Sequence, residues 1–477
     1  MTTLVGIDVG TTGVKALAVS PEGDVLARAE AAYPLSTPQP GWAEQDPEDW
    51  WRAAEAALVR LGLDGVAGIG LSGQMHGLVA LDERERVLRP AILWNDQRTA
   101  AECAEIEERI GLRRLVELTG NRALPGFTAP KLLWLRRHEP DVFARITHVL
   151  LPKDYVRLRL TGELAIDVAD ASGTLLLDVA HRRWSGEVLR ELDIPPDWLP
   201  PVLESPVVSG HTSDGLPVAA GAGDQAAGAL GVGADRPGPL SVVLGTSGVV
   251  FAALPGYAAD PEGRVHSFCH AVPNRWHAMG VMLSAAGSLH WLRDAVAPGE
   301  PFERLTAEAE RWPPGAEGIV FLPYLAGERT PHVDPDARGA FVGLSLRHDR
   351  GALVRAVLEG VAFGLRDSLE LLRSLGIEPH LARISGGGAR SDLWLRILAS
   401  VLNVPLERTA AEEGAAYGAA LLGGVAAGVF SDVHEAVAAT VRVTRRIEPE
   451  RAWVEPYAQG YARFRSLYPA LRPLEEA

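Results

Sequence analysis

An aspartate at position 8 stands inside an apolar run and is followed at once by small turn residues; the segment reads GIDVGTTGVKAL over residues 6–17. Turns rich in glycine and threonine can aim backbone N–H and hydroxyl groups at an anion. A carboxylate beside a bound phosphate is tolerated only when Mg²⁺ or water lies between the two groups. The segment therefore predicts that Asp8 and the Thr11-Thr12 turn belong to a Mg²⁺-phosphate site.

A second segment, VLGTSGVV at residues 243–250, repeats this pattern in the second half of the chain. Both copies lead into further apolar sequence, so each predicts a strand-turn-strand hairpin rather than the strand-to-helix turn of a P-loop. Only the first copy carries a carboxylate, because Val243 takes the place of Asp8. Either copy alone also fits an ordinary glycine-rich hairpin with Asp8 in a local hydrogen bond, but the pair favours one phosphate held between two hairpins.

A third glycine-rich element, GGG at residues 386–388, lies between a predicted strand at 382–385 and a predicted helix at 391–402. Glycines let a flat ligand approach the backbone closely, and Ser391 can cap the helix that follows. An ordinary connection between a strand and a helix explains these glycines equally well.

Asp224 follows the apolar segment at residues 218–223 and stands where a helix is predicted to start. It is either the N-cap of that helix or a carboxylate that accepts the proton of an acceptor hydroxyl group during phosphoryl transfer. The surrounding glycines and alanines leave space for a substrate, which favours the base.

Two polar segments at predicted strand ends can bind the hydroxyl groups of a sugar. SGQMHG, after the predicted strand at 66–71, supplies Met75 and His76, and WNDQR supplies Trp94 and Asn95. Core packing of Met75, a buried or capping role for His76 and simple bracing of a loop by the second segment are the alternative explanations.

Short Val/Ile/Leu runs alternate with helical patterns along the chain, which predicts an α/β fold. With 477 residues the chain exceeds what one hydrophobic core usually supports. Glycine and proline are concentrated near residues 233–239, so we expect two domains, 1–236 and 237–477.

Two helices stand out in the pattern. Asp46 and Pro47 predict the start of the first, and its apolar stripe is predicted to consist of Trp50, Trp51, Ala54 and Leu58. The aromatic residues between Val441 and Ala477 predict a short terminal extension with a packed final helix.

The composition excludes several classes of function. Lys and Arg number 46 and Asp and Glu 61, and the resulting net charge of −15 repels nucleic acid. Cys103 and Cys269 lack metal-ligand spacing, so neither a zinc site nor a disulfide framework is expected, and a reducing cytoplasm fits. The first residues predict no signal peptide, and prolines interrupt the uncharged stretch at 237–259, so no membrane segment is expected.

Taken in order, these motifs resemble the FGGY family of carbohydrate kinases over nearly the whole chain. Further matching segments are GWAEQDPEDWW, RPAILWNDQR, PGFTAPKLLWLRRHEPDVF, LLPKDYVRLRLTGE, HSFCHAVPNRWHAMGVMLSAAGSLHW, FLPYLAGERTPH, RAVLEGVAFGLRDSL and SGGGARSDLW. Within the family, the QMHG segment resembles that of the members that phosphorylate D-xylulose. The resemblance implies a two-domain actin-like ATPase fold of RNase H-like domains, with ATP in the cleft and the sugar deeper between the domains.

The resemblance also implies roles for individual residues. Asp8 would serve Mg²⁺, and Asp224 would be the catalytic base. The implied ATP-binding residues are Thr11, Thr12, Lys15, Gly245, Thr246, Gly386, Gly387, Arg390 and Ser391. The implied substrate-binding residues are Met75, His76, Trp94, Asn95, Asp224 and Gln225. Gln225 departs from the asparagine that the xylulose-phosphorylating members usually place after the catalytic aspartate.

We therefore expect in-line transfer of the ATP γ-phosphate to the 5-hydroxyl group of D-xylulose. A kinase of the same family for another ketose or polyol, of the ribulose type, is the first alternative. A non-catalytic ATPase clamp is the second, although the additional peptide-binding module that it would need is not visible. A homodimer is possible, as in similar kinases.

Overall fold

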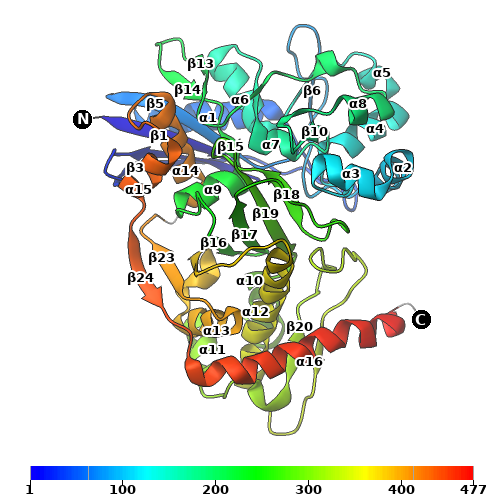
Figure 1. Ribbon diagram of the computed structural model, residues 1–477, viewed down its shortest axis with the longest axis vertical. Helices are drawn as coiled ribbons and strands as arrows, with labels where there is room; N and C mark the ends of the chain where they lie inside the picture. Colours follow the sequence, from blue (N-terminus) through cyan, green and yellow to red (C-terminus); the bar gives the residue numbers. More distant parts are fainter. Residues whose placement is uncertain (1, 63, 412, 476–477) are drawn as a thin grey trace.

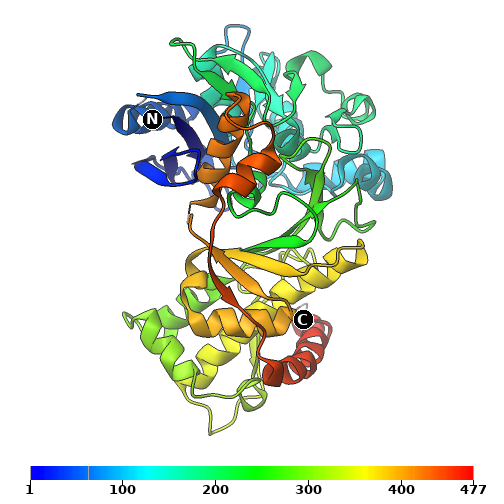
Figure 2. The ribbon, with the colours of Figure 1, turned by 60° about the vertical axis from the view of Figure 1, so that its left-hand side comes forward.

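The computed structural model describes residues 2–62, 64–411 and 413–475; residues 476–477 of the predicted second domain, and Met1 of the first, lie outside the described residues. Two seven-stranded sheets, one formed by each half of the chain, organise the molecule. Figures 1 and 2 show two lobes, each built around one of these sheets.

The first sheet has the strand order β13-β14-β5-β1-β2-β3, with β15 beside β5. Its strands are β1 (Thr3–Val9), β2 (Gly13–Val19), β3 (Val25–Ala32), β5 (Val66–Gly73), β13 (Val208–His211), β14 (Pro217–Ala219) and β15 (Ala222–Gly223). The strands β1, β2 and β3 form an antiparallel meander, whereas β5 is parallel to β1, and β14 and β15 are parallel to β5. The predicted hairpin and the predicted strand at 66–71 are both confirmed.

The second sheet has the order β18-β19-β17-β16-β22-β23-β24. Its strands are β16 (Pro239–Leu244), β17 (Gly248–Leu254), β18 (His266–Cys269), β19 (Trp276–Met282), β22 (Leu381–Ser385), β23 (Leu406–Thr409) and β24 (Val443–Ile447). An antiparallel meander again adjoins two parallel strands and a final antiparallel strand. The two sheets therefore repeat one arrangement, and each opens with one of the two predicted hairpins.

Helices cover both sheets. Those of the first lobe are α1 (Pro47–Leu61), α2 (Ala100–Ile110), α3 (Leu112–Thr119), α4 (Thr128–His138), α5 (Pro140–Phe143), α6 (Pro152–Thr161), α7 (Val168–Ser172), α8 (Gly186–Glu191) and α9 (Asp224–Gly231). The later ones are α10 (Ala286–Val296), α11 (Phe302–Ala309), α12 (Arg350–Ser374), α13 (Asp392–Leu402), α14 (Gly414–Ala426), α15 (Val433–Thr440) and α16 (Arg451–Glu475).

Short elements complete the two lobes. The two-stranded pairs are β4 (Glu44–Gln45) with β7 (Ala91–Ile92), β6 (Val79–Leu81) with β8 (His148–Leu150), β9 (Ile166–Asp167) with β12 (Val202–Leu203), β10 (Leu177–Asp178) with β11 (Arg183–Trp184), and β20 (Val320–Leu322) with β21 (Ala340–Val342). The 3₁₀ helices are η1 (Pro196–Trp198), η2 (Ala316–Gly318) and η3 (Gly387–Arg390).

Helix α1 begins as its sequence predicts. The Asp46 side chain accepts a hydrogen bond from the backbone N–H of Glu48, and Pro47 occupies the first helical position. Three residues of the predicted apolar stripe, Trp50, Ala54 and Leu58, are buried against the first sheet, whereas Trp51 is only half-buried.

Helix α14 follows β23 in the chain but packs on the first sheet, and Figure 1 shows it beside β1 and β5. The approach is so close that a Cβ atom on Gly6 would lie 1.9 Å from the Ala416 carbonyl oxygen, and one on Gly70 would lie 1.8 Å from that of Ala419. Glycine is therefore required at both strand positions. The covering of the first sheet thus includes residues from the second half of the chain.

The last segment of the chain is more than the short extension that its sequence predicts, and in this respect the prediction is wrong. Strand β24 completes the edge of the second sheet, and α16 spans 25 residues. Tyr457, Tyr461 and Phe464 of α16 are buried in the core of the second lobe, as the aromatic pattern predicts. Both cysteines are buried free thiols. Among the described residues, no helix has the length and apolar character that crossing a bilayer requires.

Candidate functional site

The parallel strands β1, β5 and β15 bring the predicted catalytic residues to one edge of the first sheet. Asp8 pairs in register with Ser72, and Ser72 pairs with Ala222, two residues before Asp224. The carboxyl ends of parallel strands meet at the same edge of a sheet, which is where α/β folds commonly bind ligands. The residues after these strands therefore lie together although they are far apart in the sequence.

Asp8 carries an unsatisfied carboxylate oxygen. Among the described residues its Oδ1 atom is buried without a hydrogen-bond partner. Burial raises the pKa of Asp8 to about 6, against the opposing effects of Ser72 and of Lys15, which faces Asp8 across the hairpin. A buried carboxylate oxygen without a partner is costly unless a cation or donor satisfies it, so Asp8 has the chemistry of a ligand for a hard divalent cation.

Asp224 is the first residue of α9, whereas Gly223 is the N-cap. The alternative that Asp224 is only the N-cap is therefore wrong. Burial, followed by the negative charge of Asp8, raises the pKa of Asp224 to about 7, while hydrogen bonding to Gln225 acts in the opposite direction. The negative charge of Asp8 thus reaches Asp224 and favours its protonated form.

The turn of the first hairpin presents free N–H groups. No residue that the structure describes accepts a hydrogen bond from the N–H groups of Thr11 and Thr12. Thr11 is half-buried, whereas Thr12 and the Lys15 side chain are exposed. The hairpin can therefore offer two backbone donors and two hydroxyl groups to an anion.

The second hairpin opens into a cleft of about 770 Å³ between η3, α10, α11 and α13. Five predicted ATP-binding residues line this cleft: Gly245, Thr246, Gly387, Arg390 and Ser391. The apolar side chains of Leu289 and Phe302 form part of its wall. The structure thus brings together residues that lie more than 140 positions apart, as a nucleotide site requires.

The glycine-rich segment after β22 forms this cleft by a close approach to the second hairpin. Gly386 has φ 93°, and a Cβ atom there would lie 2.6 Å from the Leu244 carbonyl oxygen. The predicted loop continues into the short helix η3, and the Ser391 side chain caps α13 by accepting a hydrogen bond from the Trp394 N–H. The predicted cap is confirmed.

Met75 packs against Gly223, the residue that precedes Asp224, and His76 follows Met75 in the chain. The Met75 side chain packs so closely on Gly223 that a Cβ atom there would lie 2.7 Å from its Cγ atom. Burial lowers the pKa of His76 to about 3, so the imidazole is neutral. Its Nδ1 atom lies 2.6 Å from the Gly173 carbonyl oxygen and donates to it, which leaves Nε2 as an acceptor.

An apolar cluster around Met75 joins the two lobes. It contains Phe127 from the first lobe together with Val249 and Phe268 from the second sheet. Val243, which takes the position of Asp8 in the second hairpin, packs against the same cluster. Met75 therefore packs in a core, as the alternative explanation for this residue holds, while its predicted contact with the sugar stays a prediction.

Trp94 and Asn95 lie at the first hairpin. The Trp94 indole Nε1 donates to Thr11 Oγ1 over 3.0 Å. Asn95 Oδ1 is a buried oxygen without a hydrogen-bond partner among the described residues, so it can accept a hydrogen bond from a ligand hydroxyl group. Gln225 is half-buried beside Asp224.

The sequence analysis did not identify Lys131, which contacts the backbone of the predicted site residue His76. Lys131 is buried and donates from Nζ to the carbonyl oxygens of His76, at 2.8 Å, and Gly126, at 2.7 Å. Its burial lowers the lysine pKa well below the usual range. The lysine within a segment otherwise rich in apolar residues, KLLWL, was the available signal.

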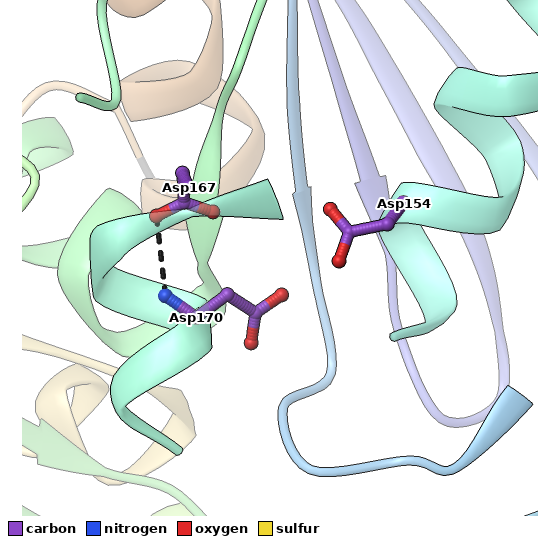
Figure 3. Close-up of side chains that lie close together, drawn as sticks. All are labelled: Asp154, Asp167 and Asp170. Atoms are coloured by element: carbon purple, nitrogen blue, oxygen red, sulfur yellow. Dashed lines mark hydrogen bonds between the residues drawn. The ribbon is translucent and has the colours of Figure 1, made fainter. Parts of the chain in front are cut away.

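Three carboxylates, Asp154, Asp167 and Asp170, converge between α6 and α7 (Figure 3). The Lys153 ammonium group lies 2.5, 2.7 and 3.1 Å from them, respectively, and all four side chains are fully buried. Two cations that belong to the chain, Lys153 and the Arg157 guanidinium that pairs with Asp154, therefore already pair with this cluster. It ties α6 to α7, whose last turn leads to the Gly173 carbonyl group that orients His76.

The two sheets share one topology, and the first two strands of each are joined by a glycine- and threonine-rich turn that can bind an anion. This arrangement defines the class of two-domain actin-like ATPase folds. The family comparison agrees: residues 3–231 match the N-terminal domain, and residues 240–427 the C-terminal domain, of the FGGY family of carbohydrate kinases. The chain belongs to this family of sugar kinases.

Individual relatives extend over the whole chain. The xylulose kinase of Escherichia coli (strain K12) is 44% identical over an alignment of 491 positions that covers 98% of this chain and 99% of that protein. The crystal structure of xylulose kinase from Rhodospirillum rubrum has 35% identity and a TM-score of 0.92, with both chains covered fully. The gluconokinase of Bacillus subtilis (strain 168) is 30% identical over an alignment of 485 positions that covers 96% of this chain and 93% of that protein.

Proposed function

We propose that this chain transfers the γ-phosphate of ATP to the 5-hydroxyl group of D-xylulose, with Asp224 as the general base. The observation that carries the proposal is the position of Asp224, at the start of α9 and beside both Met75 and Asp8. Family membership and the 44% identity to a xylulose kinase support the substrate.

The proton of the 5-hydroxyl group would pass to the Asp224 carboxylate as the oxygen attacks the phosphorus atom in line with the leaving group. A pKa near 7 keeps a large fraction of Asp224 ionised at neutral pH and still basic enough to accept a proton. His76 Nε2 and Asn95 Oδ1 would accept hydrogen bonds from other hydroxyl groups of the sugar and fix its orientation. No phosphoenzyme is needed.

The nucleotide would lie in the cleft of the second hairpin, with Gly387, Arg390 and Ser391 along one wall. Its phosphate groups would extend towards Thr11, Thr12 and Lys15 of the first hairpin, where free N–H groups stabilise developing negative charge. Asp8 would hold Mg²⁺, which when bound neutralises phosphate charge. We expect the domains 1–236 and 237–477, the latter contributing α14 to the first lobe, to close around both substrates.

The experiment that tests this function is a coupled assay of ADP release with D-xylulose, D-ribulose, L-ribulose, D-fructose and glycerol at equal concentration. We expect the highest kcat/KM for D-xylulose and slow ATP hydrolysis without sugar. A higher value for any other sugar of the panel would contradict the substrate, and no sugar-dependent ADP release at all would contradict the activity.

A sugar acid is the second candidate substrate. The gluconokinase relative is the observation that favours it. D-gluconate therefore belongs in the same panel, and turnover of D-gluconate above that of D-xylulose would select this candidate.

A further inference from the structure

Two buried glutamine side chains hold the turn of the first hairpin. Gln45 lies on β4 and Gln74 follows β5, and each is only 2% exposed. Gln74 Nε2 donates to the carbonyl oxygen of Gly10 over 3.2 Å, and Gln45 Nε2 donates to that of Thr11 over 2.7 Å. The two amides therefore engage two consecutive carbonyl groups of the turn.

The orientation of the two amides follows from their other partners. Trp50 Nε1 donates to Gln45 Oε1 over 2.9 Å, and Gln74 Nε2 donates to the same oxygen over 3.0 Å. An indole N–H can only donate, so the Gln45 oxygen must face Trp50 and its NH₂ group must face the turn. The Tyr33 hydroxyl group donates to the Gly10 carbonyl oxygen as well.

These contacts determine where the N–H groups of the turn point. In a trans peptide unit the C=O and N–H bonds point in opposite directions. Holding the Gly10 and Thr11 carbonyl groups on the glutamine side therefore aims the N–H groups of Thr11 and Thr12 away from it. These are the two N–H groups for which no described residue provides an acceptor.

In the second hairpin, backbone N–H groups rather than side-chain amides hold the carbonyl groups of the turn. The backbone N–H groups of Ala286 and Ala285, at the start of α10, donate to the carbonyl oxygens of Gly245 and Thr246, each over 2.8 Å. The N–H group of Thr246 is again left without an acceptor among the described residues. In the first hairpin, side-chain amides take the place of these backbone donors.

We propose that Gln45 and Gln74 are positioning residues that aim the N–H groups of Thr11 and Thr12 at the phosphate groups of the nucleotide. This inference rests on the proposed function, because it presumes that the first hairpin binds phosphate. The glutamines do not touch the nucleotide, and they act through the two carbonyl groups that they hold.

The test uses the full chain with Gln45→Met, Gln74→Met and the double variant, because methionine keeps the volume of glutamine but cannot donate. We expect each single variant to raise the KM for Mg-ATP on the order of 10-fold, because it loses one or two buried hydrogen bonds. The KM for the sugar should rise by less than about 2-fold. The double variant should be no more than about 2-fold worse than the worse single variant, since the glutamines act as a unit. Gln459→Met, on the exposed face of α16, is the matched control.

The outcomes are distinguishable from failure of the proposed function. Calorimetric titration of the unmodified chain with Mg-ATP tests nucleotide binding without any sugar chemistry. If the unmodified chain binds Mg-ATP and both variants keep its KM for Mg-ATP, the positioning role is overturned. Equal increases in both KM values would also overturn it, because they indicate a general structural defect. If a glutamine variant fails to fold, the other single variant must give the same selective increase in the KM for Mg-ATP, because each glutamine holds one of the two carbonyl groups.

Discussion

The two sheets present the same hairpin at the same place in the same topology, but they equip it with different chemistry. The first hairpin carries Asp8, with a buried and unsatisfied carboxylate oxygen, and lies next to Asp224. The second carries Val243, which packs against apolar residues, and opens into the cleft of about 770 Å³. Under the proposed function, this repeated framework would separate two tasks, with acid-base and cation chemistry on the first sheet and nucleotide binding on the second.

The largest expected effect is a loss of turnover through the first lobe without a loss of nucleotide binding in the second lobe. Asp224→Ala removes the proposed base, so kcat should fall on the order of 100- to 10,000-fold. Binding of Mg-ATP, measured by calorimetry, should change little because the cleft lies at the second hairpin. A folded variant with near-normal turnover would remove Asp224 from the mechanism.

Exchanging the residues that distinguish the hairpins sharpens the comparison. Asp8→Asn should lower turnover at saturating Mg²⁺ roughly 100-fold, because the site loses the charge that a cation needs. Val243→Asp should not restore it, since the new carboxylate would lie against the apolar cluster rather than beside Asp224. Steady-state rates over a range of Mg²⁺ concentrations provide the measurement. Recovery of turnover in the double variant would show that the hairpins are interchangeable.

A substitution at Gly386 tests the second hairpin alone. Alanine there would place its Cβ atom 2.6 Å from the Leu244 carbonyl oxygen and would retain a positive φ. We expect the KM for ATP to rise roughly 5- to 150-fold, since the strain costs on the order of 1–3 kcal/mol, while kcat at saturating ATP stays within about 2-fold. Gly376→Ala is a suitable comparison, because it shares the positive φ but has no atom within 4 Å of the added Cβ. Equal effects of both changes would refute the role of close approach.

The smallest expected effect is on how the free energy of unfolding depends on pH. The raised pKa values of Asp8, about 6, and Asp224, about 7, mean that between about pH 4 and pH 7 the folded chain holds protons that the unfolded chain has released. The free energy of unfolding should therefore decrease as pH rises through this window. Asp8→Asn should make the decrease shallower, because it removes one of the two groups and the charge that raises the pKa of Asp224. Chemical denaturation at several pH values measures the slope, and an unchanged slope in the variant would contradict the coupling.

Local patterns predicted the individual elements well. The two GT(T/S)G hairpins, the start of α1 at Asp46 and the cap of α13 at Ser391 all depend on neighbouring residues, so the sequence carries them directly. Asp224 was correctly placed at the start of a helix, although only the structure shows that Gly223 is the N-cap. The last segment was the weakest prediction, because membership of β24 in the second sheet depends on pairing with β23.

By itself, then, the sequence determined which residue types stand in each turn and at each strand end, since glycine, threonine and aspartate act through their own backbone freedom and charge. Only the tertiary structure decided which of them meet. The pairing of β1, β5 and β15 brings Asp8 and Asp224 together, and the packing of α14 on the first sheet joins segments from both halves of the chain. Burial then does what no local pattern can do: by removing water from the two carboxyl groups, it raises their pKa values towards neutrality.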